Sequence, residues 1–214
     1  MKFSFLKIVV FFTFLLFTAL SHATTSGWKK YSTQDNKNIL DLRLTSATEG
    51  VGRLSKIPAS LEILPFQGWK TYWRSPGDAG LPTEIILKNS ENVKEIKILW
   101  PAPHRFSIFG IDTFGYKGRT LLPLEIYPEN TGEDINIHAE INILACKDIC
   151  VPVTKEVFLF IPSGPEKPTE FARLRAEFVS LVPKKLLPYN VSFDQLLIDE
   201  NGIILKGIEI PKID

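Results

Sequence analysis

The two cysteines of this 214-residue chain, Cys146 and Cys150, lie close together in the stretch ACKDICVPV. A pair at this spacing has three chemical uses: a structural disulfide, two ligands of a metal ion, or a dithiol that exchanges electrons with other thiols. A bridge closing a loop of about five residues contributes only about 2 kcal/mol in the chain-entropy model. A short bridge across a hairpin also tends to depart from relaxed disulfide geometry, which makes it easier to reduce. The residues alone leave a structural staple and a redox pair open.

A metal site is the weakest use of the cysteine pair. After the first 23 residues the chain has two histidines, His104 and His138, and no methionine. A soft metal such as copper would be held by Cys146, Cys150 and at most His104, which lies in a proline-rich loop. His138 is about 26 Å from Cys146 along an extended strand and is expected to be a solvated face residue. Copper on those three residues stays as the weak alternative; otherwise we expect no metal and no cofactor.

Motifs of other reaction classes are missing from the sequence. There is no G-x-S-x-G nucleophile elbow, no G-x-G-x-x-G fingerprint, no P-loop and no paired zinc-type C-x-x-C. A thioredoxin-type C-x-x-C within a βαβ pattern is also missing. If the chain is an enzyme, the cysteine pair makes it a thiol–disulfide oxidoreductase of the protein-disulfide reductase type.

Residues 1–23 have the layout of a cleavable secretory signal peptide. Lys2 and Lys7 give a positive start, an apolar run covers residues 8–20, and small residues precede Thr24. A membrane-spanning helix needs about 20 apolar residues, so we expect export without stable membrane insertion. Without Lys2 and Lys7, 23 of the 25 basic residues remain against 24 acidic ones, which argues against a nucleic-acid or polyanion binder.

Residues 24–162 are predicted to form an all-β, immunoglobulin-like antiparallel sandwich. Alternating apolar residues predict half-buried strands at 40–44, 57–63, 96–100 and 120–128. Pro123 favours an edge or a bulge for the last of these strands. Turn-forming residues separate the strands, and seven or eight short strands at this spacing are typical of such a sandwich.

The strand that leads into the cysteines is the most regular of the chain. From 134 to 146 the odd positions are apolar, so they are expected to face the core and to leave Cys146 on the outer face. The following strand repeats this phase, with apolar odd positions and Cys150 at an even one. If residues 147–149 form a three-residue hairpin loop, the two sulfurs face each other away from the core. A bulge in the loop would shift this register.

The last part of the chain is predicted to hold a helix and a short β tail. In residues 163–188, a Pro- and Gly-rich linker precedes an amphipathic helix with Phe171, Leu174, Phe178 and Leu181 at helical spacing. The helix is expected to lie on the sandwich, with partner binding as the alternative. Residues 189–214 contain two strand-like runs, which form a docked hairpin-like tail or the start of an incomplete second β module.

Three motifs, in order, resemble the N-terminal periplasmic domain of the DsbD and ScsB family. They are QGWKTYWRSPGDAGLP (67–82), ILWPAPHRFSIFGIDTFGY (98–116) and LACKDICVP (144–152). The family comprises bacterial thiol–disulfide interchange proteins and related copper-tolerance membrane reductases. The three-residue spacing between the cysteines is similar to the copper-tolerance, ScsB-like branch. The resemblance covers about residues 28–162 and implies an immunoglobulin-like fold.

The resemblance implies that Cys146 and Cys150 are the redox pair of a periplasmic relay. Its electron donor would be a membrane-embedded thiol reductase, and its client a thioredoxin-fold or other periplasmic protein. The family also shields its pair with an aromatic residue on a cap loop, for which Phe106 and Phe109 are the candidates. The aromatic residues of the first two motifs are interpreted as core and sheet residues: Trp69, Tyr72, Trp73 and Trp100. No role is derived for the turn at 75–80.

Two departures from the best-known family members bear on this expectation: the shorter spacing of the cysteines and the missing domains. The transmembrane relay and the C-terminal thioredoxin domain have no counterpart in this sequence, so the chain needs a separate membrane partner or is a shortened descendant. The alternative function is a non-enzymatic periplasmic module that binds copper or a partner protein and carries a structural disulfide. A relay needs a reducible and accessible cysteine pair, whereas a staple needs neither.

Overall fold

The computed structural model describes residues 24–33, 35, 37–108 and 110–184, together with the backbone of 195–199 and 202–206. The predicted signal peptide at 1–23 and the candidate shield Phe109 lie outside the described residues. The chain divides into a first unit that ends at Val182 and a second unit from Pro183 to Asp214. No helix in the described ranges is long and apolar enough to span a membrane.

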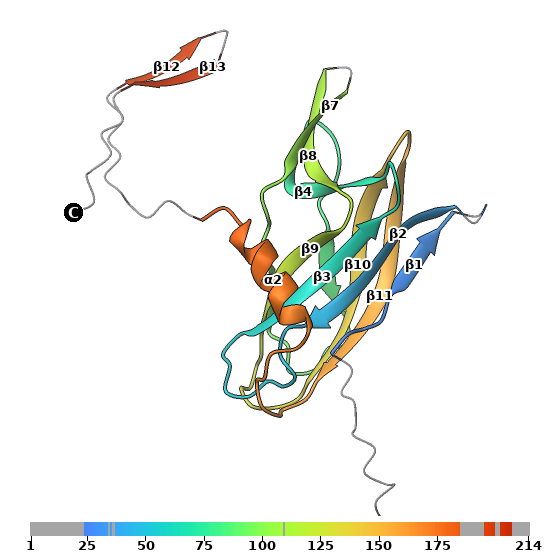
Figure 1. The fold of residues 1–214 in the computed structure, drawn as a ribbon, viewed down its shortest axis with the longest axis vertical. Coiled ribbons are helices and arrows are strands. Elements are labelled where there is room, and N and C mark those ends of the chain that lie inside the picture. The colour runs from blue at the N-terminus through green and yellow to red at the C-terminus, as the bar shows by residue number, and fades with distance from the viewer. Residues whose placement is uncertain are drawn as a thin grey trace, which may run out of the picture. The chain divides into compact units, whose positions relative to one another are not determined.

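The first unit contains two antiparallel β-sheets packed face to face (Figure 1). One sheet has the strand order β1-β2-β3-β9-β6. Its strands are β1 Lys29–Ser32, β2 Asn38–Ser46, β3 Ile57–Pro65, β9 Thr120–Tyr127 and β6 Glu95–Ile98. The alternating apolar pattern predicted four of these five strands close to their bounds, because each turns one face to the core.

The second sheet has the strand order β11-β10-β4-β8-β7, and a further strand, β5, also pairs with β10. Its strands are β11 Cys150–Ile161, β10 Ile135–Cys146, β4 Lys70–Gly77, β8 Ile111–Lys117, β7 His104–Ile108 and β5 Glu84–Leu87. The two sheets confirm the predicted all-β, immunoglobulin-like sandwich. They hold more strands in the described residues than the seven or eight expected, because strands as short as β5 show no clear alternation.

The core between the sheets consists of the apolar faces that the sequence pattern predicted. The six odd residues of β10, from Ile135 to Ala145, are at most 3% exposed, and Val153, Val157 and Ile161 of β11 follow the same phase. The strands β2 and β3 contribute the opposing apolar faces. Because side chains alternate with period two, the even residues of β10 and β11 lie on the face away from the core.

Pro123 lies inside a sheet and not at an edge, contrary to the prediction. Its strand β9 pairs with β3 on one side and with β6 on the other. The Pro123 carbonyl accepts a hydrogen bond from the Leu99 N–H (2.8 Å), one residue past the end of β6. The missing N–H of Pro123 therefore faces the end of β6, and the ladder with β3 loses no donor.

The helix α2 (Phe171–Ser180) packs on the first sheet, where it contacts β9 and β2 (Figure 1). Phe171 is buried, and the Arg175 guanidinium donates hydrogen bonds to the carbonyls of Ala59 (3.0 Å) and Leu124 (3.1 Å). The predicted helix on the sandwich is confirmed. Leu181, the last residue of the predicted apolar stripe, is past the helix and 52% exposed.

The second unit contains the strands β12 (Gln195–Asp199) and β13 (Gly202–Lys206), which pair antiparallel. The two strand-like runs predicted in the C-terminal tail therefore form a β-hairpin.

Candidate redox site around Cys146 and Cys150

Cys146 and Cys150 form a disulfide at the tip of the β10–β11 hairpin. The two residues are the last pair of the ladder, with Cα atoms 4.0 Å apart. Residues 147–149 form the loop, in which the Lys147 N–H donates a hydrogen bond to the Ile149 carbonyl (2.9 Å). The predicted three-residue loop and the predicted pairing of the two even positions are both confirmed.

The two bonded cysteines differ in exposure. Cys146 is 2% exposed, whereas Cys150 is exposed and follows Ile149, which is 68% exposed. Both cysteines lie on the face away from the core, as the phase of the strands predicts. On this outer face, however, Cys146 is shielded from solvent. A thiol from another molecule therefore reaches Cys150 more easily than Cys146.

A row of four residues crosses the outer face at the disulfide. Lys70 of β4 pairs with Cys146 of β10, and on its other side it pairs with Lys117 of β8. Directly opposed residues of antiparallel strands carry their side chains on the same face. The row thus runs Lys117, Lys70, Cys146, Cys150, so Lys70 lies next to the disulfide and Lys117 one strand further away.

Tyr72 approaches the exposed sulfur from the same face of β4. Its hydroxyl oxygen is 3.9 Å from the Sγ of Cys150, and the residue is only 4% exposed. Burial raises the pKa of Tyr72, so the phenol keeps its proton at neutral pH and is able to donate it toward the sulfur. Tyr72 is thus a buried residue of the sheet whose hydroxyl group also lies near the disulfide.

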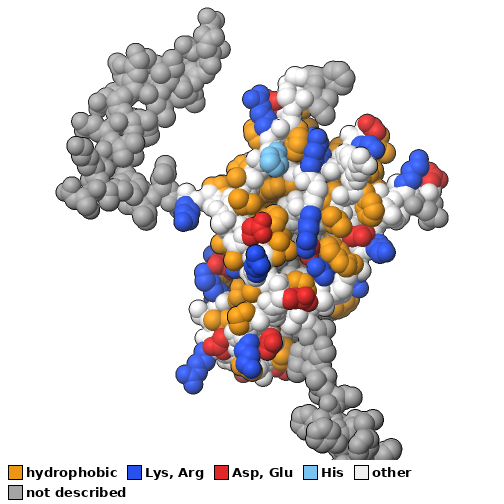
Figure 2. Space-filling view, in the orientation of Figure 1, with side chains coloured by type: hydrophobic (Ala, Val, Ile, Leu, Met, Phe, Trp, Pro, Cys, Tyr) orange, Lys and Arg blue, Asp and Glu red, His pale blue; other side chains and the backbone are white. Residues whose placement is uncertain are grey.

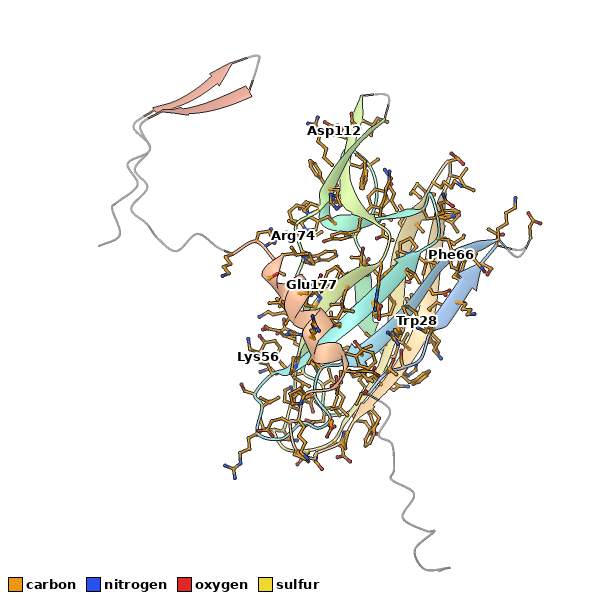
Figure 3. All side chains as sticks on the ribbon, in the orientation of Figure 1. Trp28, Lys56, Phe66, Arg74, Asp112 and Glu177 are labelled. Atoms are coloured by element: carbon orange, nitrogen blue, oxygen red, sulfur yellow. A yellow bond between two sulfur atoms is a disulfide. The ribbon has the colours of Figure 1, made fainter. Side chains whose placement is uncertain are left out.

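The turn at 75–80 holds the Tyr72 ring in place. Gly80 has φ +112°, and a Cβ atom at this position would overlap the Tyr72 ring. Asp78 fixes the turn to β8: its N–H donates to the Asp112 carbonyl (2.9 Å), and its carboxylate accepts from the Asp112 N–H (2.8 Å). Figure 3 shows Asp112 on the β7–β8 hairpin. A motif for which the sequence suggested no role thus supports the tyrosine beside the disulfide.

The ammonium group of Lys70 is enclosed by a hydroxyl group and two aromatic rings. It donates a hydrogen bond to the Thr113 Oγ1 (2.9 Å), and it lies 5.1 Å from the ring centroid of Phe106 and 5.5 Å from that of Tyr72. Burial, and next the positive charge of Lys117, lower the pKa of Lys70. Lys70 was not among the residues predicted from the sequence, where its one signal is its place in the first of the three motifs.

Phe106, the candidate shield in the described residues, lies on β7 above both lysines of the row. It is half-buried, and its ring centroid is 4.7 Å from the Lys117 ammonium group. The structure therefore brings Phe106 to the residues that surround the disulfide. Its shielding role stays a prediction.

His104, the third residue of the weak metal alternative, is exposed at the start of β7. Over the described ranges, no group of three or more His, Cys, Asp or Glu side chains is arranged to hold a metal ion. His138 is half-buried: its ring stacks on Phe158 with centroids 4.3 Å apart, and its Nε2 lies 3.4 Å from a carboxylate oxygen of Glu156.

A groove of about 260 Å³ extends along the outer face beside the disulfide. Its apolar lining includes Leu81 and Pro82, and also Leu144 and Pro152, which are the next outward-facing pair of the β10–β11 ladder. Leu81 is 63% exposed. Apolar surface next to an accessible disulfide is suited to the docking of another protein.

Comparison with known proteins places the site in a known family. The family described as "Thiol:disulfide interchange protein DsbD, N-terminal" matches residues 53–162. Among solved structures, the N-terminal periplasmic domain of ScsB from Proteus mirabilis is similar, with a TM-score of 0.56 and 26% sequence identity over 75% of this chain and 60% of that chain. The present chain therefore spans less than two thirds of the ScsB domain.

The N-terminal domain of DsbD from Neisseria meningitidis, in its reduced form, matches with a TM-score of 0.31 and 10% identity over 55% of this chain and 86% of that chain. A search of the curated proteins gave no significant match.

The matched region extends from just before β3 to the end of β11 and contains the whole site. It covers more than half of the chain, and the resemblance predicted from the three motifs is confirmed. The chain belongs to the family of the N-terminal domain of the thiol:disulfide interchange protein DsbD.

Proposed function

We propose that this protein is a periplasmic relay that passes electrons from a membrane-embedded thiol reductase to thioredoxin-fold or other periplasmic clients. The family supports thiol–disulfide interchange, and the ScsB relative is a periplasmic domain. The observation that carries the proposal is the asymmetry of the disulfide, with Cys150 exposed and Cys146 2% exposed. An exchange-active pair needs one sulfur that a partner is able to attack.

The exposures suggest an order of steps. A donor thiolate attacks the Sγ of Cys150, the Cys146–Cys150 bond breaks, and Cys146 leaves as a thiolate with the electron pair. A second donor thiolate then attacks the donor sulfur of the mixed disulfide and releases Cys150 as a thiolate. The donor is oxidised to a disulfide, and this domain gains two electrons.

Electron delivery to a client reverses these roles. The Cys150 thiolate attacks a client disulfide, and one client sulfur leaves as a thiolate. Cys146 then attacks Cys150 in the mixed disulfide, which reforms the Cys146–Cys150 bond and releases the second client thiolate. Two electrons pass to the client, and the thiolates take protons from water according to their pKa values.

Phe106 is proposed to limit access to the pair between encounters. Its half-buried ring contacts the ammonium groups of Lys70 and Lys117, which belong to the same row as the cysteines. Movement of the β7–β8 hairpin would carry this ring away from the row when a partner docks.

The reduction potential of the purified protein from residue 24 onward tests the proposal. Exchange-active pairs lie at roughly −120 to −270 mV, whereas structural bridges lie below about −300 mV. We expect a value in the upper range, measured in glutathione or dithiothreitol buffers. A pair that stays oxidised below that range would instead support the alternative, a binding module with a structural disulfide.

Single-cysteine variants test the order of steps. Cys146→Ser leaves the exposed thiol, and Cys150→Ser leaves the buried one. We expect Cys146→Ser to react with a soluble aromatic disulfide at least about tenfold faster, because access limits the exchange of a buried thiol. Equal rates would contradict the assignment of Cys150 as the attacked sulfur.

A further inference from the structure

The described residues contain two buried charged side chains, Glu62 and Lys70, and their surroundings differ. Glu62 is 0% exposed and forms ion pairs with Arg43 and Arg119. Lys70 is 9% exposed, and within the described part of the chain no carboxylate forms an ion pair with it. A buried charge without an opposite charge is costly, so the position calls for a specific reason.

The contacts of Lys70 do not supply an anion. Its ammonium group has a neutral hydroxyl, that of Thr113, as hydrogen-bond acceptor and the rings of Phe106 and Tyr72 as neighbours. The nearest charged side chain of its row is Lys117, which has the same sign. These contacts hold the ammonium group in the oxidised protein without neutralising it.

An anion forms beside Lys70 when the disulfide opens. Cys146 is the direct ladder partner of Lys70, with both side chains on the outer face. In the oxidised protein the ammonium group is turned toward Thr113 of β8, on the side of β4 away from β10. Directly opposed residues have Cβ atoms about 4.5–5.5 Å apart, so the four-carbon arm of a lysine is long enough to turn from Thr113 to the neighbouring sulfur. Cys146 is 2% exposed, so water gives its thiolate little stabilisation.

We infer that Lys70 supplies the positive charge that stabilises the Cys146 thiolate once the Cys146–Cys150 bond has broken. The inference rests on the proposed function and names the residue that tunes the same site. An opposite charge beside a thiol favours the thiolate, and a better leaving thiolate makes the disulfide easier to reduce. Tyr72 serves the other sulfur, since its hydroxyl group points to Cys150.

Other titratable groups lie near the row, and a test must distinguish their effect on the Cys146 thiolate from that of Lys70. They are Lys117 on β8, Tyr72 on β4, His104 on β7, and Lys147 and Asp148 in the hairpin loop. The two loop residues are exposed and have opposite charges. Lys117 is exposed, and it provides the matched control because it is the neighbour of Lys70 in the row.

The experiment titrates the Cys146 thiolate in the Cys150→Ser protein by its absorbance near 240 nm. Lys70→Met removes the charge at similar length, Lys70→Arg keeps it, and Lys117→Met removes the neighbouring charge. We expect Lys70→Met to lower the thiolate fraction at neutral pH about tenfold, in line with a pKa shift of one unit or more for a lost opposite charge. Lys70→Arg should retain most of the thiolate, and Lys117→Met should have the smaller effect.

The same substitutions in the two-cysteine protein give a second readout. If Lys70→Met lowers the equilibrium constant for reduction of the disulfide tenfold, its reduction potential should be about 30 mV lower than that of wild type. A merely structural role for Lys70 would change unfolding but not the thiolate titration, and an unchanged titration in Lys70→Met would overturn the inference. If Lys70→Met fails to fold, Lys70→Gln removes the charge with a polar side chain: a tenfold loss of thiolate supports the inference, and a wild-type titration contradicts it.

The two proposals fail in different ways. If the wild-type pair resists dithiothreitol while the Cys146 titration still depends on Lys70, the relay is wrong and the charge pairing stands. If the wild-type pair exchanges normally and Lys70→Met leaves both titration and potential unchanged, the relay stands and the role of Lys70 is wrong.

Discussion

At the scale of single residues, the two sulfurs of the disulfide have different neighbours. Cys150 is exposed, with the Tyr72 hydroxyl group 3.9 Å away, while Cys146 is buried next to Lys70. Thiol–disulfide exchange needs an accessible sulfur for attack and a stabilised thiolate to leave. The structure offers these two conditions at different cysteines, so the first bond to form is expected at Cys150.

Lys70→Met is expected to stabilise the oxidised protein by about 1 kcal/mol at neutral pH, because it removes a buried charge that has no anionic partner. Burial lowers the pKa of Lys70 from its ordinary value of 10.5, so the unfolded chain binds this proton more tightly than the folded protein. The stability that wild type has at high pH is therefore lost as pH falls through the folded pKa. As pH rises toward 10.5, the free energy of unfolding of wild type should therefore increase relative to that of Lys70→Met.

Urea unfolding of both oxidised proteins at about pH 7 and about pH 10 measures this difference, and the other titrating groups cancel between them. A difference in the free energy of unfolding that is the same at both pH values would show that the pKa of Lys70 is not lowered in the folded protein.

The sequence predicted the residues that follow a local rule and missed those that depend on distant contacts. The pairing of Cys146 with Cys150 follows from the period-two phase of two adjacent strands. The burial of Cys146 does not, because its neighbour in the next strand of the sheet, Lys70 of β4, lies far earlier in the chain. Lys70 becomes a candidate only when the register between β4 and β10 is known.

At the scale of elements, the site depends on a regular hairpin and an irregular turn. The β10–β11 hairpin is regular because one face of both strands packs on the core, and the sequence predicted it closely. The turn at 75–80 carries no periodic pattern, so its contact with Tyr72 was not predictable. Pro123 shows the same limit, since its position inside the sheet depends on where β6 ends.

Gly80→Ala is expected to destabilise the protein more than Gly118→Ala, and Gly118 is a matched control. Both glycines have a positive φ, but a Cβ atom at Gly118 (φ +72°) meets open space, whereas one at Gly80 overlaps the Tyr72 ring. Gly118→Ala should cost about 1 kcal/mol from backbone conformation alone. Gly80→Ala should cost about 1–3 kcal/mol more, because the ring must move.

Urea unfolding measures both costs, and the rate at which the Cys150 thiol reacts in the Cys146→Ser background reports the displacement of Tyr72. If the two alanine variants are equally stable and react at equal rates, the turn does not hold the tyrosine against the disulfide.

At the scale of the whole molecule, the site belongs to the first unit. Within the described part of the chain, the buried apolar residues lie between Ile39 and Phe171, and the cysteine pair closes the hairpin of the second sheet. Figure 2 shows acidic and basic side chains interspersed with apolar ones on the face in view, in keeping with the formal net charge of +1 for the full sequence. Partner choice is therefore expected to depend on the local surface at the disulfide and not on a long-range field.

A protein of residues 24–182 is expected to fold and to keep the reduction potential of the protein of residues 24–214. All buried apolar side chains of the described residues lie in this range, and its last backbone hydrogen bonds include Ala102 N–H to the Leu181 carbonyl and Val182 N–H to the Val179 carbonyl. A protein that ends at Ile161 is the matched control. It lacks buried Phe171 and the two Arg175 hydrogen bonds, so it should lose about 3–5 kcal/mol of stability.

Thermal unfolding and a redox titration of the three proteins test this division of the chain. The 24–182 protein should match the longer one in both measurements, and the protein that ends at Ile161 should unfold at a lower temperature. If the 24–182 protein is less stable or has a shifted potential, residues 183–214 contribute to the sandwich or to the cysteine pair, and the domain does not end at Val182. A shifted potential with unchanged stability would place that contribution at the redox site, since a loss of core packing would lower both.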